Sequence, residues 1–155
     1  MPDSEGPYLS MAVLCEKVLQ EASGVPSIIR VVDRVLITMP PAPVIISAAL
    51  PAPEQPDPQI NLTIALMFKA GKFRGDRNLT VRLTAPSGLR HPETTLPLLF
   101  EGDDDRGINI FLPFVLVAHE LGIYWFDLDL GEELIARIPL RLVNQQISVS
   151  TPPVL

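Results

Sequence analysis

Residues 122–142 read GIYWFDLDLGEELIARIPLRL, and this stretch decides the fold class of the chain. Large apolar side chains fill every second position from Tyr124 to Leu130, and alternate positions are apolar again from Leu134 to Leu142. The two runs are joined by the short polar link 131–133, which begins with a glycine. Alternation on both sides of such a link is typical of an antiparallel hairpin with one buried and one solvated face. The stretch predicts the central hairpin of an all-β sandwich.

The length and composition of the chain indicate one globular domain over residues 1–155. Apolar residues make up 47% of the sequence, which is enough to build a sizeable core. The 17 prolines exceed the average usage of about 5%, and proline interrupts helices. Strands and turns are therefore favoured over long helices.

The charge and the cysteine content exclude several classes of function. A net charge of −6 repels phosphate backbones, so nucleic-acid binding would need a local basic patch. Cys15 is the single cysteine, which excludes an internal disulfide and any zinc site with several cysteines. We expect no cofactor and no structural metal.

The N-terminal sequence does not resemble a targeting segment. No basic residue precedes the first apolar run, and Glu16 and Lys17 interrupt that run. No stretch of about 18 apolar residues is present to cross a bilayer. We expect a cytoplasmic protein without a membrane partner.

The N-terminal third predicts a first hairpin. A loose tail over 1–7 leads into a strand from Tyr8 to Cys15, followed by a polar connection over 16–24; a short helix over Met11–Ala22 is the alternative. The run 27–39 is rich in β-branched residues and predicts a second strand that pairs with the first. Asp33 and Arg34 interrupt this run and indicate a bulge or a bend.

The opening YLSMAVLCEKVLQEASGVPSIIRVVDR and the closing Gly-x-Tyr-x-Phe-x-Leu-x-Leu resemble an uncharacterised family of small bacterial proteins. Members open with a strand that ends in Cys-Asp/Glu and return on a Ser-Ile/Leu-Ile strand. The resemblance covers about residues 8–143. It implies a β-sandwich fold, and it assigns no activity and no site.

Further period-two runs complete the predicted fold. Strands are expected over 60–70, 78–85, 94–100 and 108–117, and Pro97 marks the third of these as an edge strand. The tail 144–155 either adds an edge pairing or trails in solvent. About eight strands with turn signals between them predict a two-sheet antiparallel β-sandwich of immunoglobulin-like type.

A proline-rich segment over 40–58 separates the first hairpin from the rest of the chain. Its seven prolines surround the apolar heptapeptide VIISAAL at 44–50. Proline favours extended conformations that lose little entropy on docking, so the segment is a candidate contact for a partner. The alternative is a fold-back as an edge strand or a cover over one end of the sandwich. The expected apolar anchors are Val44, Ile45, Ile46 and Leu50.

The sequence contains few residues whose type and spacing suggest catalysis. Cys15 with His119 or His91 could form a nucleophile and base, but a cysteine within an apolar run is usually a small core side chain. His119 and Glu120 begin like a zinc-protease motif, which fails because position 123 is Ile and the segment joins two strands.

Two charged segments offer binding alternatives. The acidic loop 101–105 could hold an ion, although a solvated turn is the better interpretation of its spacing. The turn 69–77 places basic residues around Phe73 and could contact nucleic acid or an acidic partner, although the net charge favours a simple connecting turn.

The sequence therefore favours a non-catalytic protein-binding or assembly module whose partner is another protein or a second copy. Phe73 and Trp125 join the four anchors of 40–58 as candidate contact residues, because Trp125 lies on the same side of its strand as Asp127 and Asp129. A small hydrolase-like or ion-binding enzyme domain is the alternative. A weak nucleic-acid contact through 69–77 is the second alternative.

Overall fold

The computed structural model describes residues 5–39 and 56–145, and every regular element in these ranges is a β-strand. No helix in the described ranges has the length and apolar character needed to cross a membrane. In chain order the strands are β1 (Tyr8–Gln20), β2 (Pro26–Val31), β3 (Arg34–Ile37), β4 (Gln59–Lys69), β5 (Gly75–Thr84), β6 (Thr94–Phe100), β7 (Gly107–Val117), β8 (Gly122–Leu130) and β9 (Glu133–Asn144).

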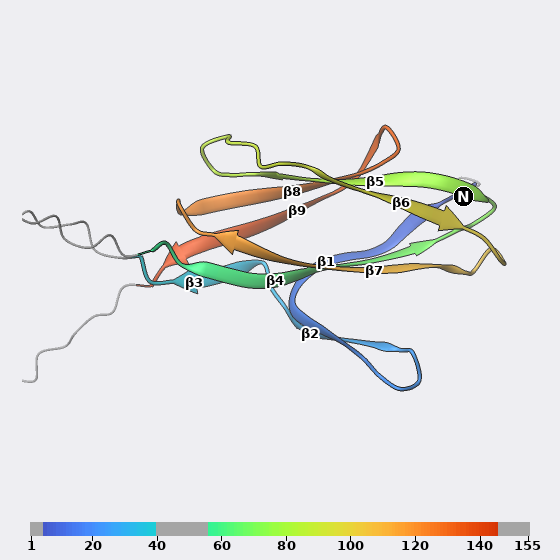
Figure 1. The fold of residues 1–155 in the computed structure, drawn as a ribbon, viewed down its shortest axis with the longest axis horizontal. Coiled ribbons are helices and arrows are strands. Elements are labelled where there is room, and N and C mark those ends of the chain that lie inside the picture. The colour runs from blue at the N-terminus through green and yellow to red at the C-terminus, as the bar shows by residue number, and fades with distance from the viewer. Residues whose placement is uncertain (1–4, 40–55, 146–155) are drawn as a thin grey trace, which may run out of the picture.

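The strands form two sheets that pack face to face (Figure 1). One sheet has the order β2-β1-β4-β7 and the other has the order β3-β9-β8-β5-β6. The predicted all-β, two-sheet sandwich is confirmed. Strand β6 lies at an edge, as Pro97 indicates.

The core lies between the two sheets and is built from alternate residues of each strand. Phe114 of β7 and Phe126 of β8 meet across it with ring centroids 5.1 Å apart. Ile138 of β9 is only half-buried, whereas Leu140, the next residue on the same side of that strand, is fully buried. The fully buried large side chains include Leu14, Leu66, Phe68, Leu79, Phe100, Leu116, Tyr124, Leu128, Leu140 and Leu142.

The hairpin β8–β9 forms as its alternation predicts. The pairing runs from Gly122 opposite Leu142 to Leu130 opposite Glu133, with one irregularity after Leu128. Gly131 adopts a φ of 63° in the connecting turn, a conformation that a side chain would disfavour. The short link therefore ends one strand and starts the next.

The predicted single strand over 27–39 is wrong. The chain forms β2, crosses at Val32 and Asp33, and continues as β3 in the opposite sheet. The amide of Arg141 in β9 donates to the carbonyl of Asp33, and β3 pairs with β9 in parallel. The polar interruption marks a change of sheet. Within the described ranges, this change brings the number of strands to nine and gives the otherwise antiparallel sheets one parallel pair.

Strand β1 is longer than predicted, and the helix over 11–22 does not form. Up to Cys15, β1 pairs with β4; Cys15 also pairs with Val31 of β2, and from Lys17 to Gln20 β1 pairs only with β2. Residues 16–31 thus form a two-stranded ribbon, here called the arm, which stands off the sandwich (Figure 1). The predicted pairing of the first two chain segments is confirmed, but most of that hairpin lies outside the core.

Candidate functional site

The two outer faces of the sandwich differ sharply in chemistry. On the five-stranded sheet, Arg82 pairs with Asp129, and Arg137 Nε lies 2.7 Å from Asp127 Oδ1. The Arg137 guanidinium also lies over the Trp125 ring, 4.8 Å from its centroid. The candidate contact residue Trp125 is half-buried within this ladder of paired charges. This face is an ordinary solvated sheet surface.

The outer face of the four-stranded sheet carries no charge in its centre. Leu62, Ile64 and Leu66 of β4 point into the core, so Thr63 and Ala65 point outward. Their cross-strand neighbours share the same side and form three rows, Met11–Met67–Asn109, Val13–Ala65–Phe111 and Cys15–Thr63–Pro113. We call these nine residues the apolar face. Eight of the nine are neither charged nor amide side chains, which is unusual for a sheet exposed to water.

The small members of the apolar face are shielded by the large ones. Cys15 and Ala65 are fully buried, and Thr63 is 8% exposed, although all three point away from the core. Strand β4 therefore has five consecutive buried residues, Leu62–Leu66. Such a run is typical of a strand that is covered on both faces. Beside these rows, Val31 is 61% exposed and Val115 is 56% exposed.

A hollow opens where β1 leaves β4. It has a volume of about 300 Å³ and lies between the base of the arm and the ends of β4 and β7. Glu16 contributes the only charged group in its lining. The lining residues are Glu16, Asn61, Leu62, Thr63, Pro113, Phe114 and Val115.

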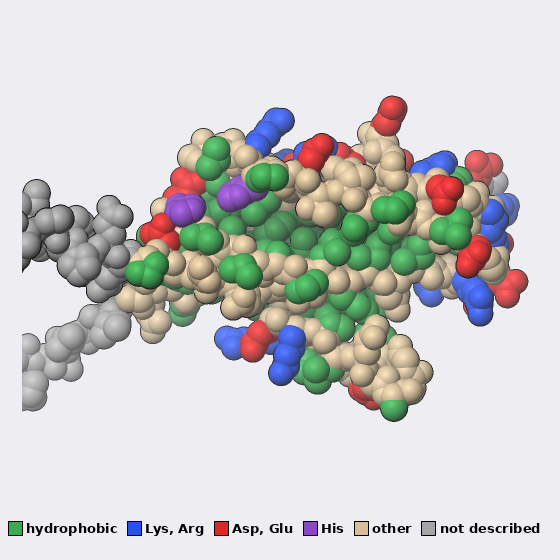
Figure 2. All heavy atoms as spheres, in the orientation of Figure 1, with side chains coloured by type: hydrophobic (Ala, Val, Ile, Leu, Met, Phe, Trp, Pro, Cys, Tyr) green, Lys and Arg blue, Asp and Glu red, His purple; other side chains and the backbone are tan. Residues whose placement is uncertain are grey.

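The arm carries apolar side chains into solvent. Leu19, Val25 and Val31 are exposed, and the space-filling view shows the arm projecting below the body with apolar groups on its surface (Figure 2). At its base Arg30 Nη1 lies 3.3 Å from Glu16 Oε2. Arg30 adopts a φ of 55°, which is uncommon for a residue other than glycine. A residue with an uncommon backbone conformation therefore lies at the base of the arm.

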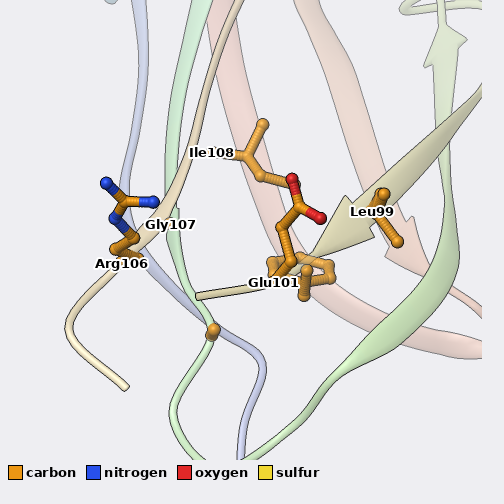
Figure 3. A pocket seen from close by; sticks show the side chains of 7 residues that line it. Leu99, Glu101, Arg106, Gly107 and Ile108 are labelled. Carbon is orange, nitrogen blue, oxygen red and sulfur yellow. The ribbon is translucent and has the colours of Figure 1, made fainter. Parts of the chain in front are cut away.

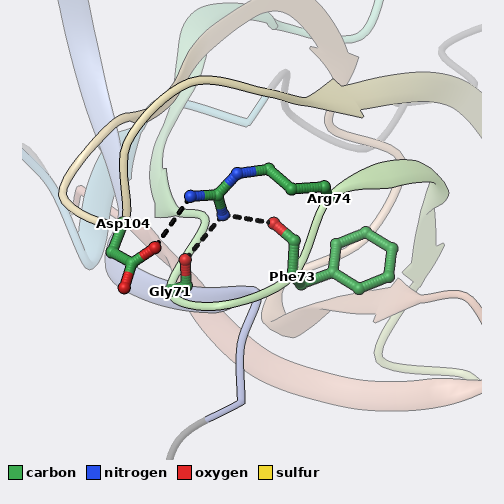
Figure 4. A network of polar contacts seen from close by, with 4 residues as sticks. All are labelled: Gly71, Phe73, Arg74 and Asp104. Atoms are coloured by element: carbon green, nitrogen blue, oxygen red, sulfur yellow. Dashed lines mark hydrogen bonds and ion pairs between the residues drawn. The ribbon is translucent and has the colours of Figure 1, made fainter.

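The two charged segments predicted from the sequence lie side by side and are joined by an ion pair (Figure 4). Arg74 donates to the carbonyls of Gly71 and Phe73, at 2.7 Å each, and to Asp104 Oδ1 at 2.7 Å. Lys69 Nζ donates to the Asp105 carbonyl at 3.0 Å. Within the described residues no group of three or more histidine, cysteine or carboxylate side chains is placed to hold a metal.

Phe73 is not the exposed aromatic that the sequence indicates. It is half-buried, and its ring meets Phe100 edge-on with centroids 5.9 Å apart. The Arg77 guanidinium covers it at 4.0 Å from the centroid. The ring packs against the end of the core because the turn folds over Phe100, so it is not free to stack on a base.

A second hollow, of about 310 Å³, lies at the end of β6 and the start of β7. Glu101 points between Leu99 and Ile108, whereas Arg106 projects to the other side (Figure 3). The polar groups do not converge on a common point, as a ligand site requires. This hollow is a crevice beside the paired loops.

The residues considered for catalysis are held apart. The Cys15 thiol contacts the Thr63 carbonyl at 3.5 Å, and burial raises the pKa of the thiol, which disfavours the nucleophilic thiolate. His119 follows the end of β7, where Val117 pairs with Gln59 of β4. The thiol lies beside Thr63, which is four residues further along β4 than Gln59. Since a strand rises about 3.3 Å per residue, Gln59 and Thr63 are about 13 Å apart along β4. The structure does not bring the thiol and the imidazole together.

Two polar pairs near the end of β7 were not anticipated from the sequence. His119 Nδ1 lies 2.5 Å from Asp57 Oδ2, and Glu120 Oε1 accepts from both Ser87 N at 3.1 Å and Ser87 Oγ at 2.8 Å. The hydroxyl is therefore bonded to a carboxylate and not to the imidazole. These contacts tie three loops together and do not form a Ser-His-Asp triad.

The four anchors in the proline-rich segment, Val44, Ile45, Ile46 and Leu50, lie outside the described residues. The apolar face was missed by the sequence reasoning. The sequence signal that could have indicated this face lies in β4: residues 62–68, LTIALMF, have no charged residue at the positions that face outward.

Comparison with known proteins assigns no function. No protein-family model matches the chain, and no curated protein is similar to it.

Proposed function

We propose that the chain is a non-catalytic protein-binding or assembly module and that its contact surface is the apolar face together with the arm. The observation that carries the proposal is the outer surface around Thr63 and Ala65 of β4, whose three rows contain no charged residue and which adjoins the exposed Val31 and Val115. An exposed apolar patch of this kind marks an interaction site more often than it marks a solvated sheet. The opposite outer face provides the contrast, because its charges are paired.

The contact surface offers useful binding energy. Full burial of a valine side chain contributes about 1.5–3 kcal/mol relative to exposure. Val31 and Val115 are each more than half exposed, so each would contribute roughly 1 kcal/mol when covered. The uncharged character of the rows favours a protein partner, since a nucleic acid requires a positive surface.

The geometry gives less support to the alternative functions. An enzyme based on Cys15 would need a base within hydrogen-bond reach, and His119 instead contacts Asp57. A nucleic-acid contact through 69–77 would need free basic groups, and Arg74 is committed to Asp104 and to two backbone carbonyls. Phe73 and Trp125 are left out of the contact surface because arginine side chains cover both rings.

The proposal includes a cytoplasmic location and an immunoglobulin-like classification. Cys15 is a free and buried thiol, which fits a reducing compartment. Two packed sheets of four and five strands fit the general architecture of immunoglobulin-like domains. The resemblance to small bacterial proteins implies a β-sandwich fold, which is compatible with this classification.

The test compares two charge substitutions at positions of equal exposure. Val115→Asp places a carboxylate beside the apolar face, and Leu36→Asp places one on β3 of the other sheet, where the side chain is 58% exposed. Tagged wild-type and variant chains with matched melting temperatures are used to capture proteins from the native host. We expect Val115→Asp to lose partners that the wild type and Leu36→Asp retain. Retention of every partner by Val115→Asp would show that the contact surface is elsewhere.

A further inference from the structure

We infer that Pro97, Pro113 and Pro139 prevent the open edges of the two sheets from adding a strand of a second copy of the chain. The inference concerns the edges of the sheets and not their outer faces, so it goes beyond the proposed function and is independent of it. Its basis is the position of these prolines in the described strands and the direction in which their nitrogen atoms point.

Proline is confined to strands that have an open edge within the described ranges. The strands β1, β4, β5 and β8, each of which has a neighbour along both sides, contain no proline. Pro26 begins β2, whereas Pro97, Pro113 and Pro139 lie inside β6, β7 and β9. Strands β2, β6 and β7 end their sheets, and β9 pairs with β3 only over 141–144. Each strand that contains a proline is therefore open along at least part of one side.

The nitrogen of Pro113 points toward the open edge of β7. The amide of Ala118 donates to the carbonyl of Pro58, and these two residues are opposite each other in the register of β7 and β4. Backbone groups alternate in direction along an antiparallel strand, so the even-numbered residues of β7 bond to β4. Pro113, opposite Thr63, is odd-numbered. It therefore removes a donor from the outer edge and none from the pairing with β4.

The nitrogen of Pro97 also points outward. The amide of Gly131 donates to the carbonyl of Asn78, so the backbone groups of Asn78 point toward β8. Pro97 is opposite Asn78 on the other side of β5, where the two residues form a pair without hydrogen bonds. The missing donor of Pro97 is therefore on the open side of β6.

The same direction holds for Pro139 in β9. The amide of Arg141 donates to the residue that precedes β3, so it points away from β8. Pro139 lies two residues earlier on the same strand and has the same orientation. Its nitrogen therefore points to the part of the β9 edge that β3 does not reach.

Strands β6 and β7 have no other protection against strand addition. Neither contains a charged side chain, although lysine and other charges commonly protect sheet edges. Uncharged segments of high β-propensity pair with other chains when no proline interrupts them. Pro97, Pro113 and Pro139 are all exposed, so core packing does not account for them. The missing donors at the open edges do.

The edges at β2 and β3 are limited in other ways. Strand β3 has only four residues, which is too short to give much pairing. Strand β2 contains Arg30, whose φ of 55° departs from the extended conformation of a strand. Along the described strands, each open edge is therefore short or interrupted.

The first measurement compares the concentration at which the chain begins to associate, by sedimentation velocity and thioflavin T fluorescence. The double variant of Pro97→Thr and Pro113→Thr restores two outward donors on uncharged edges. We expect it to associate at a concentration at least about tenfold below that of the wild type, the factor that one added backbone hydrogen bond can provide. The matched control is the double variant of Pro86→Thr and Pro92→Thr, at exposed prolines in loops outside the strands. It should behave like the wild type.

The second measurement is hydrogen exchange along β7, which identifies the surface that associates. In the Pro113→Thr variant the amides of Phe111 and Val115 should gain protection as the concentration rises, because they point to the open edge. The amides of Leu112 and Phe114 bond to β4 and should be protected at every concentration. The wild type should show no such gain at Phe111 and Val115.

Three outcomes would overturn the inference. The first is a double variant that stays as dispersed as the wild type and the control. The second is association without added protection at Phe111 and Val115, since another surface would then be responsible. The third is loss of the folded state in the single variants Pro97→Thr and Pro113→Thr, which would show that these prolines serve the fold itself.

Discussion

The guanidinium of Arg74 and the carboxylate of Asp104 lie 2.7 Å apart, and this contact joins the most basic turn of the chain to its most acidic loop. Two segments that resemble separate binding sites in the sequence are therefore one structural unit. The amide of Gly71 also donates to the Asp104 carbonyl, so the backbone holds the loops in register.

Replacement of Arg74 by Ala should lower the free energy of unfolding by about 1 kcal/mol. The loss exceeds that of a typical surface ion pair because Arg74 also donates to two carbonyls of its own turn. Chemical denaturation measures the change, and Arg90→Ala, at an exposed arginine of another turn, is the control. Equal effects of the two substitutions would show that the network contributes nothing.

Phe126→Ala should lower the free energy of unfolding by about 3–5 kcal/mol. Phe126 is almost fully buried and packs against Phe114, so truncation leaves a cavity between the sheets. Urea titration followed by fluorescence gives the value. The control is Leu134→Ala on the adjoining strand, where the exposed side chain should cost about 0.5 kcal/mol or less. A small effect of Phe126→Ala would contradict the assignment of this ring to the core.

Stability should fall at alkaline pH. Burial raises the pKa of Cys15 above its ordinary value of 9.0 and that of Tyr124 above 10.0. The folded chain thus holds these protons more tightly than the unfolded chain does. The stabilisation is complete below about pH 9 and is lost as the pH rises through the folded-state values, at up to about 1.36 kcal/mol per pH unit for each group.

Denaturation curves collected between pH 8 and pH 11 test this dependence. The double variant Cys15→Ala and Tyr124→Phe lacks both groups and should show a shallower decline. Parallel curves for the wild type and the double variant would mean that neither group titrates differently on folding.

Arg30→Gly should leave the stability of the chain nearly unchanged, although glycine usually weakens a strand. A left-handed φ costs a residue with a side chain about 1–2 kcal/mol, and glycine is free of this cost. That relief offsets the added entropy of the unfolded state and the loss of the exposed pair with Glu16. Val18→Gly, in the arm strand that faces β2, should cost about 1 kcal/mol by comparison. A loss at Arg30 as large as that at Val18 would argue against strain at the base of the arm.

The parts of the fold that were predicted correctly depend on local patterns. The hairpin β8–β9 has its alternation, its link and its pairing partner within one stretch of sequence. The edge position of β6 follows from Pro97, whose missing amide is a local property.

The parts that were missed depend on distant residues. Asp33 and Arg34 indicate a bulge or a bend in the sequence, but the change of sheet depends on the pairing of Arg34 with the distant Arg141. The outward positions of β4 looked like a solvated face because Thr63 and Ala65 are small and neutral, and only the neighbouring rows from β1 and β7 show that they are covered. The candidate site was therefore hidden in a strand that the sequence located correctly.

The parallel pairing of β3 with β9 has a consequence for synthesis on the ribosome. Strand β3 is made early, yet its only strand partner within the described ranges is the last strand of the sandwich. In a nascent chain both edges of β3 therefore stay unpaired until β9 has emerged from the ribosome. In contrast, β8 and β9 are adjacent in sequence and can pair as soon as they leave the exit tunnel. During that interval the segment from Arg34 to Ile37 is open to chaperones and proteases, and arrival of β9 closes it.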